Sequence, residues 1–382
     1  MTNRKYDLVL LGATGFTGRL VAQYLQEHGG ARPWAIAGRN PDKLAALRQE
    51  LGLGCDVLHA DATAPATLES LTASCRVLVT TVGPYALHGA PVLRAAVEGG
   101  CDYVDITGEP QFVARSIGEH HARAAQDGLR IVHCCGFDSI PHDLGVLFLL
   151  RELGVSATTD EVEVAGYVRA GGTTFSGGTF HSAINVFANF RGGGRLPLAP
   201  NEGRRLSTRS DTPRFDAERG GIVLPLPTID PQIVLRSASL RADYGVRFTY
   251  GHHLVIKRLT TVLGGGLALG AMAAASQLQA GRQWLERLRP SGQGPSARQL
   301  ERGWFNVVLV GRADGRQAIV EVSGGEPGYR ETSKMLSESA LALLDDRARL
   351  SPVPGVGTPA ASIGEVLIER LQRAGLKFAR IG

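Results

Sequence analysis

The chain has 382 residues, of which 43% are hydrophobic and 20% are charged, and its formal net charge is +5 at pH 7. The length predicts two domains, and the composition is that of a globular protein whose core needs no cross-links. The mild positive charge suits an anionic ligand, whereas no dense basic run with interleaved aromatic residues points to nucleic acid. The five cysteines show no Cys/His metal spacing, so we expect no metal site and a reducing compartment.

The N-terminal residues Asn3, Arg4 and Lys5 lead directly into an expected strand, which predicts no signal peptide and a cytoplasmic protein. No stretch reaches the roughly 18 uninterrupted apolar residues that a bilayer-spanning helix requires. The apolar segment Val262–Ala275 is too short to span a membrane and has basic residues on both sides. It predicts either a buried helix or a membrane-surface or acyl-chain-binding segment, and the latter would place the protein peripherally at the inner face of the plasma membrane.

A short apolar run, Tyr6–Leu11, is typical of a buried strand and leads directly into a glycine-rich turn. From Phe16 onward the apolar spacing becomes helical. A strand, a glycine turn and a helix N-terminus form an anion site, because glycine lets the backbone approach a phosphate and the first helical N–H groups point at it. The spacing G-x-x-G-x-x-G is less specific than G-x-G-x-x-G, so a plain strand-to-helix turn is the alternative. The residues of this turn that we expect to bind a dinucleotide are Gly12, Thr14, Gly15, Phe16, Thr17 and Gly18.

The second expected strand, Pro33–Ala37, ends without an acidic residue. In NAD sites a carboxylate there binds the adenosine ribose, whereas an arginine accommodates a 2′-phosphate. Arg39 carries a permanent charge in a fork suited to phosphate, and Lys43 follows one helical turn later. The sequence therefore predicts NADP(H), with a solvated surface Arg39 as the alternative. Asn40 is expected to cap the next helix and to lie within the cofactor site.

Strands and helices alternate through about residue 150, which predicts an α/β fold with a Rossmann-type, doubly wound parallel sheet. The further strands are expected at 55–59, 76–81, 103–105 and 130–135, and the further helices at 88–98, 110–126 and 140–153. Ligands of such sheets bind beyond the carboxyl ends of the strands, where these residues should meet around one crevice. The strand-end residues that we expect to complete the cofactor site are Asp61, Thr81, Val82, Gly83 and Pro84.

After residue 155 the pattern changes to glycine clusters and separate strand-like runs, which predicts an inserted α+β substrate domain with a mixed sheet. Residues 201–220 are polar and charge-rich and predict a mobile surface loop. Two helices, at 328–344 and 362–374, are expected to return to the first domain, the second with a capping box of Ser362 and Glu365. The expected division is 1–155 for the dinucleotide-binding domain, 156–327 for the substrate domain and 328–382 for the returning helices.

The catalytic candidates lie at the ends of two expected strands. Tyr85 and His88 could donate a proton or orient the substrate, and Tyr85 could equally be a packing residue. Asp138 is a natural helix cap, and His142, one turn further on, could face the crevice. The short-chain reductase pattern Tyr-x-x-x-Lys is absent, and so are the P-loop, zinc-hydrolase and serine-hydrolase motifs.

The motifs taken together resemble the saccharopine dehydrogenase-like oxidoreductases, particularly the bacterial branch of trans-acting enoyl reductases. The resemblance is collinear over nearly the whole length. It implies a Rossmann domain, a second α+β domain, NADP(H), and reduction of a carbon–carbon double bond in a lipid or polyketide chain for an outside synthase. The segments that carry it are GATGFTG at 12–18, AGRN at 37–40, GPY at 83–85, YVDITGE at 103–109, GFDS at 136–139, SGGT at 176–179, GYRETSKML at 328–336 and TPA at 358–360.

Three functions remain open at this stage. The first is an NADPH-dependent reductase of an apolar acyl or polyketide substrate, free or bound to a carrier protein. The second is an amino-acid-type dehydrogenase that reduces an imine, for which Arg169, Arg191 and Arg195 are carboxylate-binding candidates. The third is a non-catalytic cofactor-binding protein that docks on a lipid surface. Oligomer formation is compatible with each.

Overall fold

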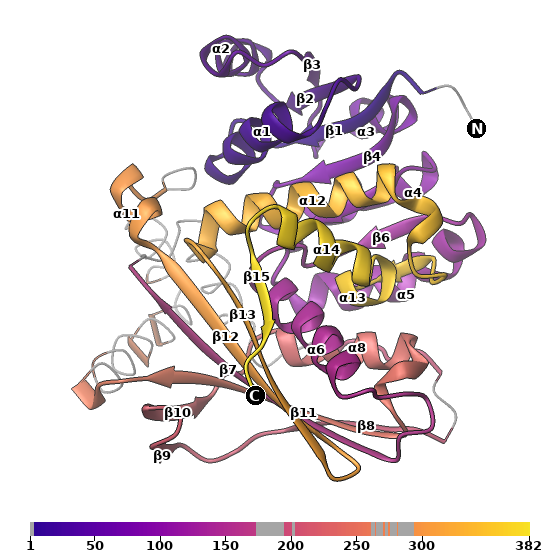
Figure 1. Cartoon of the computed structure of the whole chain (residues 1–382). Helices are drawn as coiled ribbons and strands as arrows, with labels where there is room; N and C mark the ends of the chain where they lie inside the picture. Colours follow the sequence, from indigo (N-terminus) through magenta and orange to yellow (C-terminus); the bar gives the residue numbers. More distant parts are fainter. Residues whose placement is uncertain are drawn as a thin grey trace.

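The computed structural model describes residues 4–172, 195–200, 203–260 and 294–382, together with six isolated positions between 264 and 281. The described residues form two sheets with helices packed between them (Figure 1). The SGGT motif at 176–179, Arg191 and most of Val262–Ala275 lie outside the described residues.

The first sheet is entirely parallel and has seven strands in the order β14-β6-β5-β4-β1-β2-β3. Most of these strands are buried, which explains why they read as continuous apolar runs. The strand order reverses between β1 and β4, and ligands of doubly wound sheets bind at such a reversal. The predicted fold class is confirmed. The strands are β1 (Tyr6–Leu11), β2 (Trp34–Gly38), β3 (Asp56–His59), β4 (Cys75–Thr80), β5 (Asp102–Asp105), β6 (Arg130–Val132) and β14 (Gly355–Gly357).

The helices that connect these strands begin and end at identifiable signals. Asn40 caps α2 as expected, because its side chain accepts a hydrogen bond from the Lys43 amide at 2.9 Å. Gly52 ends the same helix in the left-handed conformation. The sequence did not predict α3. The helices are α1 (Phe16–His28), α2 (Pro41–Leu51), α3 (Pro65–Ser74), α4 (Tyr85–Glu98) and α5 (Pro110–Gln126).

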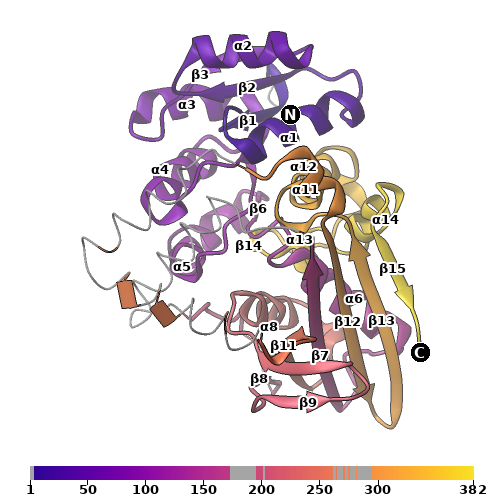
Figure 2. The same ribbon diagram turned by 90° about the vertical axis from the view of Figure 1, so that its left-hand side faces the viewer.

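The second sheet is mixed, and its long strands β7, β12 and β13 lie side by side (Figure 2). Residues 203–220 contain the strands β8 and β9, so the surface loop expected there is wrong. β8 is mostly exposed and β9 is half-buried, and neither shows the apolar alternation that indicates a strand in sequence. The strands are β7 (Glu161–Gly171), β8 (Arg205–Arg209), β9 (Arg214–Asp216), β10 (Gly221–Pro225), β11 (Arg247–Ile256), β12 (Trp304–Ala313), β13 (Arg316–Gly324) and β15 (Lys377–Arg380).

Helix α6 (Ile140–Glu152) packs against β12 and β13 of the second sheet, although the sequence pattern placed it with the first domain. Its other sides meet α8 (Asp230–Leu240) and the C-terminal helices. Almost every residue of α6 is therefore buried, and no polar stripe marks its sequence. A short helix, α11 (Ala297–Arg302), leads into β12.

The C-terminal segment contacts both sheets. Helix α12 packs against α1, β4 and β5, whereas β15 extends the second sheet. The helix expected at 362–374 is broken at Gly364, whose φ is +69°. The expected capping box is wrong, since Gly364 stands at the N-cap and the buried Ser362 hydroxyl finds no partner among the described residues. The elements are η3 (Pro327–Glu331), α12 (Thr332–Asp345), η4 (Arg347–Arg349), α13 (Pro359–Ser362) and α14 (Glu365–Arg373).

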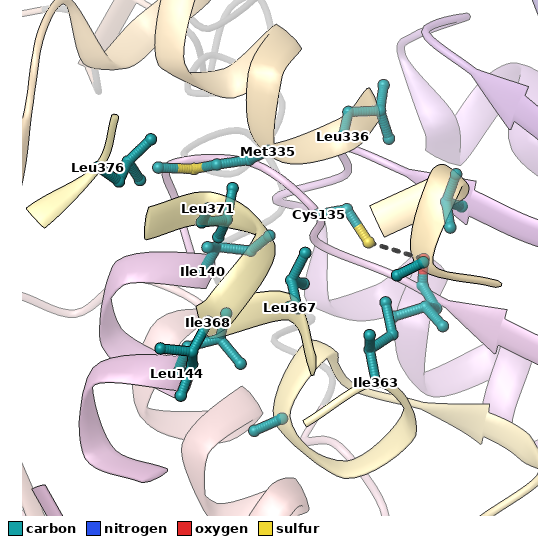
Figure 3. Close-up of a cluster of buried hydrophobic side chains, with 14 of the residues drawn as sticks. Cys135, Ile140, Leu144, Met335, Leu336, Ile363, Leu367, Ile368, Leu371 and Leu376 are labelled. Atoms are coloured by element: carbon teal, nitrogen blue, oxygen red, sulfur yellow. Dashed lines mark hydrogen bonds between the residues drawn. The ribbon is translucent and has the colours of Figure 1, made fainter. Parts of the chain in front are cut away.

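An apolar cluster holds these helices together (Figure 3). Met335 of α12, Leu367 of α14 and Leu144 of α6 come from three distant parts of the chain and are fully buried. Burying side chains of this size contributes roughly 1.5–3 kcal/mol each. The cluster therefore fixes the second sheet relative to the carboxyl edge of the first.

Candidate cofactor and active site

The glycine turn after β1 is shaped by close contacts that exclude any side chain. Gly12 has a φ of +94°, and a Cβ atom there would lie 2.8 Å from the Thr81 hydroxyl. A Cβ atom on Gly18 would lie 2.2 Å from the Gly12 carbonyl oxygen. Thr81 donates a hydrogen bond to that oxygen at 3.2 Å. The turn is thus packed against the end of β4, at the reversal of strand order.

Helix α1 starts at this turn with its first N–H groups available. Gly15 is the N-cap, and no side chain of the described residues caps the helix. The side chains of Thr14 and Thr17 both retain contact with solvent. An uncapped helix N-terminus behind a glycine turn is a site for a pyrophosphate group. The Phe16 ring packs edge-on against Tyr329, with 4.6 Å between ring centroids, and so links the turn to η3.

The end of β2 carries the predicted 2′-phosphate site. Arg39 and Lys43 are exposed, and neither forms an ion pair with another residue in the part of the chain that the structure describes. Asp61 follows β3 beside them. The amide and hydroxyl of Thr63 lower the pKa of Asp61 most, and the Arg39 charge adds to this effect. The structure therefore brings Arg39 and Asp61 together, while the Asn40 side chain is committed to capping α2.

The segment after β4 lies beside the glycine turn. The Thr81 amide donates to the Leu11 carbonyl at 3.0 Å, and the Val82 amide donates to the Thr80 hydroxyl at 3.2 Å. Gly83 and Pro84 follow, joined by a cis peptide bond. This places the predicted nicotinamide segment on the same sheet edge as the predicted pyrophosphate site.

Glu109, at the end of the loop after β5, caps the start of α4. Its carboxylate accepts hydrogen bonds from the amides of Tyr85 and Ala86, at 2.9 Å and 2.8 Å. Burial raises the pKa of Glu109, while these two amides lower it. The loop after β5 is thereby tied to the start of α4.

The geometry at Tyr85 argues against its candidate role as proton donor. Its hydroxyl is buried, donates to the Thr80 carbonyl at 3.0 Å and accepts from the Ile106 amide at 3.3 Å. Burial raises its pKa well above the usual value. The ring packs on Phe112 with 5.7 Å between centroids. The packing alternative fits Tyr85, whereas His88 is half-buried in the first turn of α4 and stays a candidate.

A buried Ser-His-Asp arrangement lies next to this edge. His133 Nδ1 contacts Asp105 Oδ2 at 2.7 Å, and His133 Nε2 contacts the Ser116 hydroxyl at 2.7 Å. All three residues are fully buried, so no substrate can reach the hydroxyl. Asp105 also accepts hydrogen bonds from the Thr107 and Cys134 amides. The arrangement therefore fixes the loops after β5 and β6 and is not a nucleophilic site.

A second polar cluster joins the start of α6 to the second sheet. His142 packs edge-on against His252 of β11, with 4.5 Å between ring centroids. Asp230, in the first turn of α8, has Oδ2 at 3.4 Å from His252 Nε2. Burial lowers the pKa of His142 to about 3, so its imidazole is neutral. His142 was predicted from the sequence, whereas Asp230 and His252 were not, because the sequence offers for them only an acid at a helix start and a histidine pair within a strand.

Asp138 lies between this cluster and the edge of the first sheet. Its Oδ2 atom would be 3.0 Å from a Cβ atom on Gly108, in the loop after β5. Surrounding protein and, to a smaller degree, the Asp230 charge raise the pKa of Asp138 to about 7. The side chain also contacts solvent, so the carboxyl group has protein on one side and water on the other. Asp138 therefore connects the predicted cofactor edge with the second domain.

These features define a class of protein. A parallel sheet with a glycine turn at its switch point and an arginine at the end of β2 is the architecture of an NADP(H)-binding oxidoreductase. Residues 8–132 match the family model described as the saccharopine dehydrogenase NADP binding domain. The chain is an NADP-dependent oxidoreductase, and its cofactor is NADP(H).

Relatives that match the whole chain show the family. A Mycobacterium tuberculosis H37Rv protein, named provisionally as a trans-acting enoyl reductase, is 38% identical over 99% of this chain and 98% of its own length. The trans-acting enoyl reductase of Mycobacterium ulcerans is 34% identical over 98% and 97%, respectively. The Mycobacterium bovis BCG protein of the same name is 32% identical over the same shares. The chain belongs to the trans-acting enoyl reductase family of saccharopine dehydrogenase-like proteins.

A solved structure supports the fold independently. Apo saccharopine dehydrogenase (L-Glu forming) from Saccharomyces cerevisiae matches with a TM-score of 0.57, covering 99% of this chain and 100% of the yeast protein. The two sequences are 14% identical. This similarity shows that the chain and the yeast protein share a fold over both domains. It does not identify the substrate.

Proposed function

We propose that this protein is an NADPH-dependent enoyl reductase that acts on an apolar acyl or polyketide chain held as a thioester on a carrier protein. The observation that carries the proposal is the collinear identity with enoyl reductases through both domains, including the domain that would hold the substrate. A cofactor domain alone is shared by many reductases, whereas the second domain is where their substrates differ.

The residues divide into binding and proton-holding roles. Bound NADPH supplies the hydride, which adds to the β-carbon of the enoyl group. The amides at the start of α1 bind the pyrophosphate, Arg39 and Lys43 bind the 2′-phosphate, and Thr81–Pro84 position the nicotinamide. The α-carbon then takes a proton. His88 and Asp138 are the candidates for holding it, because both keep contact with solvent near this edge.

A direct assay tests the proposal. Full-length protein is mixed with NADPH and 2-enoyl thioesters of pantetheine with increasing chain length, and NADPH consumption is followed by absorbance. The expected result is turnover that rises with chain length and produces the saturated thioester. Turnover with a keto acid plus an amine, but none with any enoyl thioester, would replace the proposal with an imine dehydrogenase.

Of the arginines named for the imine alternative, the structure describes Arg169 and Arg195, and it does not show them forming one carboxylate site. Arg169 of β7 reaches toward Gly220 in the β9–β10 turn, since a Cβ atom there would lie 3.6 Å from its guanidinium. Arg195 is exposed and precedes Leu196, whose amide donates to Gln232 of α8. Arg169 thus lies beside the β9–β10 turn, whereas the residue that follows Arg195 is bonded to α8.

The apolar segment supplies a separate proposal about location. Among the described residues, no helix is both long and apolar enough to cross a bilayer. We propose that Val262–Ala275, with its basic flanks, makes peripheral contact with a lipid surface where such substrates are built. Deleting the segment should reduce co-sedimentation with anionic vesicles and leave cofactor binding intact. Unchanged co-sedimentation would assign the segment to the protein core.

A further inference from the structure

Three ligand-type side chains from three separate elements converge in the second domain. His142 of α6, Asp230 of α8 and His252 of β11 each offer a nitrogen or oxygen atom, and these atoms all lie within 4.8 Å of one another. The relative exposures of the three residues are 2%, 3% and 4%. We call this set the His-Asp-His cluster.

The cluster contains several buried polar atoms without partners. His142 Nδ1, Asp230 Oδ1 and His252 Nε2 form no hydrogen bond within the described part of the chain. Each buried unsatisfied group costs about 1–3 kcal/mol, and native proteins rarely leave several together. Two of these atoms are imidazole nitrogens, and the third belongs to the carboxylate whose other oxygen, Oδ2, lies 3.4 Å from His252 Nε2. Such a buried set of electron-pair donors indicates a bound cation.

The structure assigns to this cluster a site for a divalent transition-metal ion of the zinc class. Two imidazoles and one carboxylate form a donor set that suits zinc and its neighbours. Two donors at the corners of a zinc tetrahedron lie about 3.4 Å apart when the bonds are about 2.0–2.1 Å long. His252 Nε2 and Asp230 Oδ2 are separated by 3.4 Å.

Neighbouring residues hold the donors in place as outer-shell partners of metal sites do. The Tyr250 hydroxyl contacts His252 Nδ1 at 3.1 Å, which orients the ring with Nε2 toward the cluster. The Thr228 hydroxyl donates to Asp230 Oδ2. Hydrogen bonds of this kind fix the tautomer of a histidine ligand and the orientation of a carboxylate ligand.

The local charge also favours a cation. Asp138 lies close enough to Asp230 for the two carboxylates to repel each other. In the regions that the structure describes, no lysine or arginine forms an ion pair with either carboxylate. A dication would offset this charge, and a three-residue site leaves a fourth position for water or a substrate oxygen. The inference does not depend on enoyl reduction, because it concerns binding alone.

Metal binding by the full-length protein tests the inference without an activity assay. Chelator-treated protein is dialysed against micromolar zinc chloride, and bound zinc is measured by mass spectrometry. We expect about one zinc ion per chain in the wild type and at least a tenfold loss of affinity in His142→Gln and His252→Gln. His253→Gln is the matched control, because His253 is the next residue on β11 and contacts Asp211 instead. That variant should retain the metal.

Cobalt substitution tests the inference on the wild-type protein alone, so the test does not depend on whether a variant folds. Co²⁺ bound by the wild-type protein in a four-coordinate nitrogen and oxygen site should give intense visible absorption, which added zinc should remove. Wild-type protein that binds no zinc under these conditions would overturn the inference. Zinc bound equally by folded His142→Gln and His252→Gln proteins, as judged by circular dichroism, would overturn it as well.

Discussion

Gly12 shows how a single residue shapes the cofactor edge. Its backbone is left-handed, and a Cβ atom would contact Thr81 and Val82 at 2.8 Å and 2.9 Å. We expect Gly12→Ala to lower the free energy of unfolding by roughly 1–3 kcal/mol and to abolish measurable NADPH binding. Gly52→Ala is the matched control, since Gly52 is also left-handed but has open space around it. The control should lose about 1 kcal/mol and bind NADPH normally.

Arg39 is expected to select the cofactor by its charge. A charge-assisted hydrogen bond contributes about 1.5–3 kcal/mol, so Arg39→Asp should weaken NADPH binding roughly 10- to 100-fold. NADH lacks the 2′-phosphate, and its affinity should change by less than about threefold. Fluorescence titration measures the affinities for NADPH and NADH. Arg76→Ser, at the opposite end of β4, is the control and should alter neither affinity; equal losses for both nucleotides in Arg39→Asp would refute the assignment.

Asp143 makes a pH-dependent contribution to stability. It is fully buried and accepts hydrogen bonds from the Ser237 hydroxyl at 2.5 Å and the Ala360 amide at 2.8 Å. Burial raises its pKa to about 7, against the opposing effect of these bonds. The folded protein therefore keeps a proton that the unfolded chain loses near pH 4, so stability falls as the pH rises from about 4 to 7.

Asp143→Asn should flatten this dependence. The change in slope is at most one proton, or about 1.4 kcal/mol per pH unit. Urea unfolding at several pH values between 4 and 8 provides the measurement. The pKa of Asp138 is also raised, to about 7, but its side chain is exposed, so we expect only a small dependence of the same sign to remain in the variant. A slope identical to that of the wild type would show that Asp143 is ionised throughout.

At the scale of elements, a buried ion pair joins α12 to α14. Arg370 Nε contacts Glu338 Oε2 at 2.6 Å, and the Tyr24 hydroxyl of α1 donates to Glu338 Oε1 at 2.7 Å. Arg370→Met would leave the Glu338 carboxylate buried without its cation and should destabilise the protein by about 3 kcal/mol in urea unfolding. Arg349→Met removes the half-exposed Arg349 charge from Glu369 and Asp346 and should cost less than about 1 kcal/mol, because Arg370 remains paired with Asp346. Equal losses would indicate that Arg370 acts by packing alone.

The burial of an element and the residues at its ends explain whether the sequence predicts it. Buried parallel strands such as β1 and β4 are continuous apolar runs, and α2 has both a cap and a terminating glycine. The strands β8 and β9 lack any such pattern, because β8 is mostly exposed and β9 is three residues long with two charged residues around an exposed Phe215. The helix expected at 362–374 was placed three residues too early at its start, because Ser362 and Glu365 have the spacing of a capping box whereas α14 begins only after Gly364.

At the scale of the whole molecule, the sequence predicts the cofactor-binding edge but not the His-Asp-His cluster. The glycine turn and Arg39 lie within 30 residues of each other and follow consecutive strands, so local pattern is sufficient to predict them. The His-Asp-His cluster joins residues 142, 230 and 252, which only the packing of α6 on α8 and of α8 on β11 brings together. Tyr85 was ambiguous in sequence because its hydroxyl bonds to backbone groups that no motif reveals.

The proposed function requires that a dinucleotide binds across the carboxyl edge of the first sheet. A crystal structure of the full-length protein with NADP⁺ tests this most directly. We predict electron density for the pyrophosphate on the first amides of α1, for the 2′-phosphate at Arg39, and for the nicotinamide beside Thr81–Pro84. Density for the dinucleotide at any other place on the molecule, with this edge empty, would contradict the account.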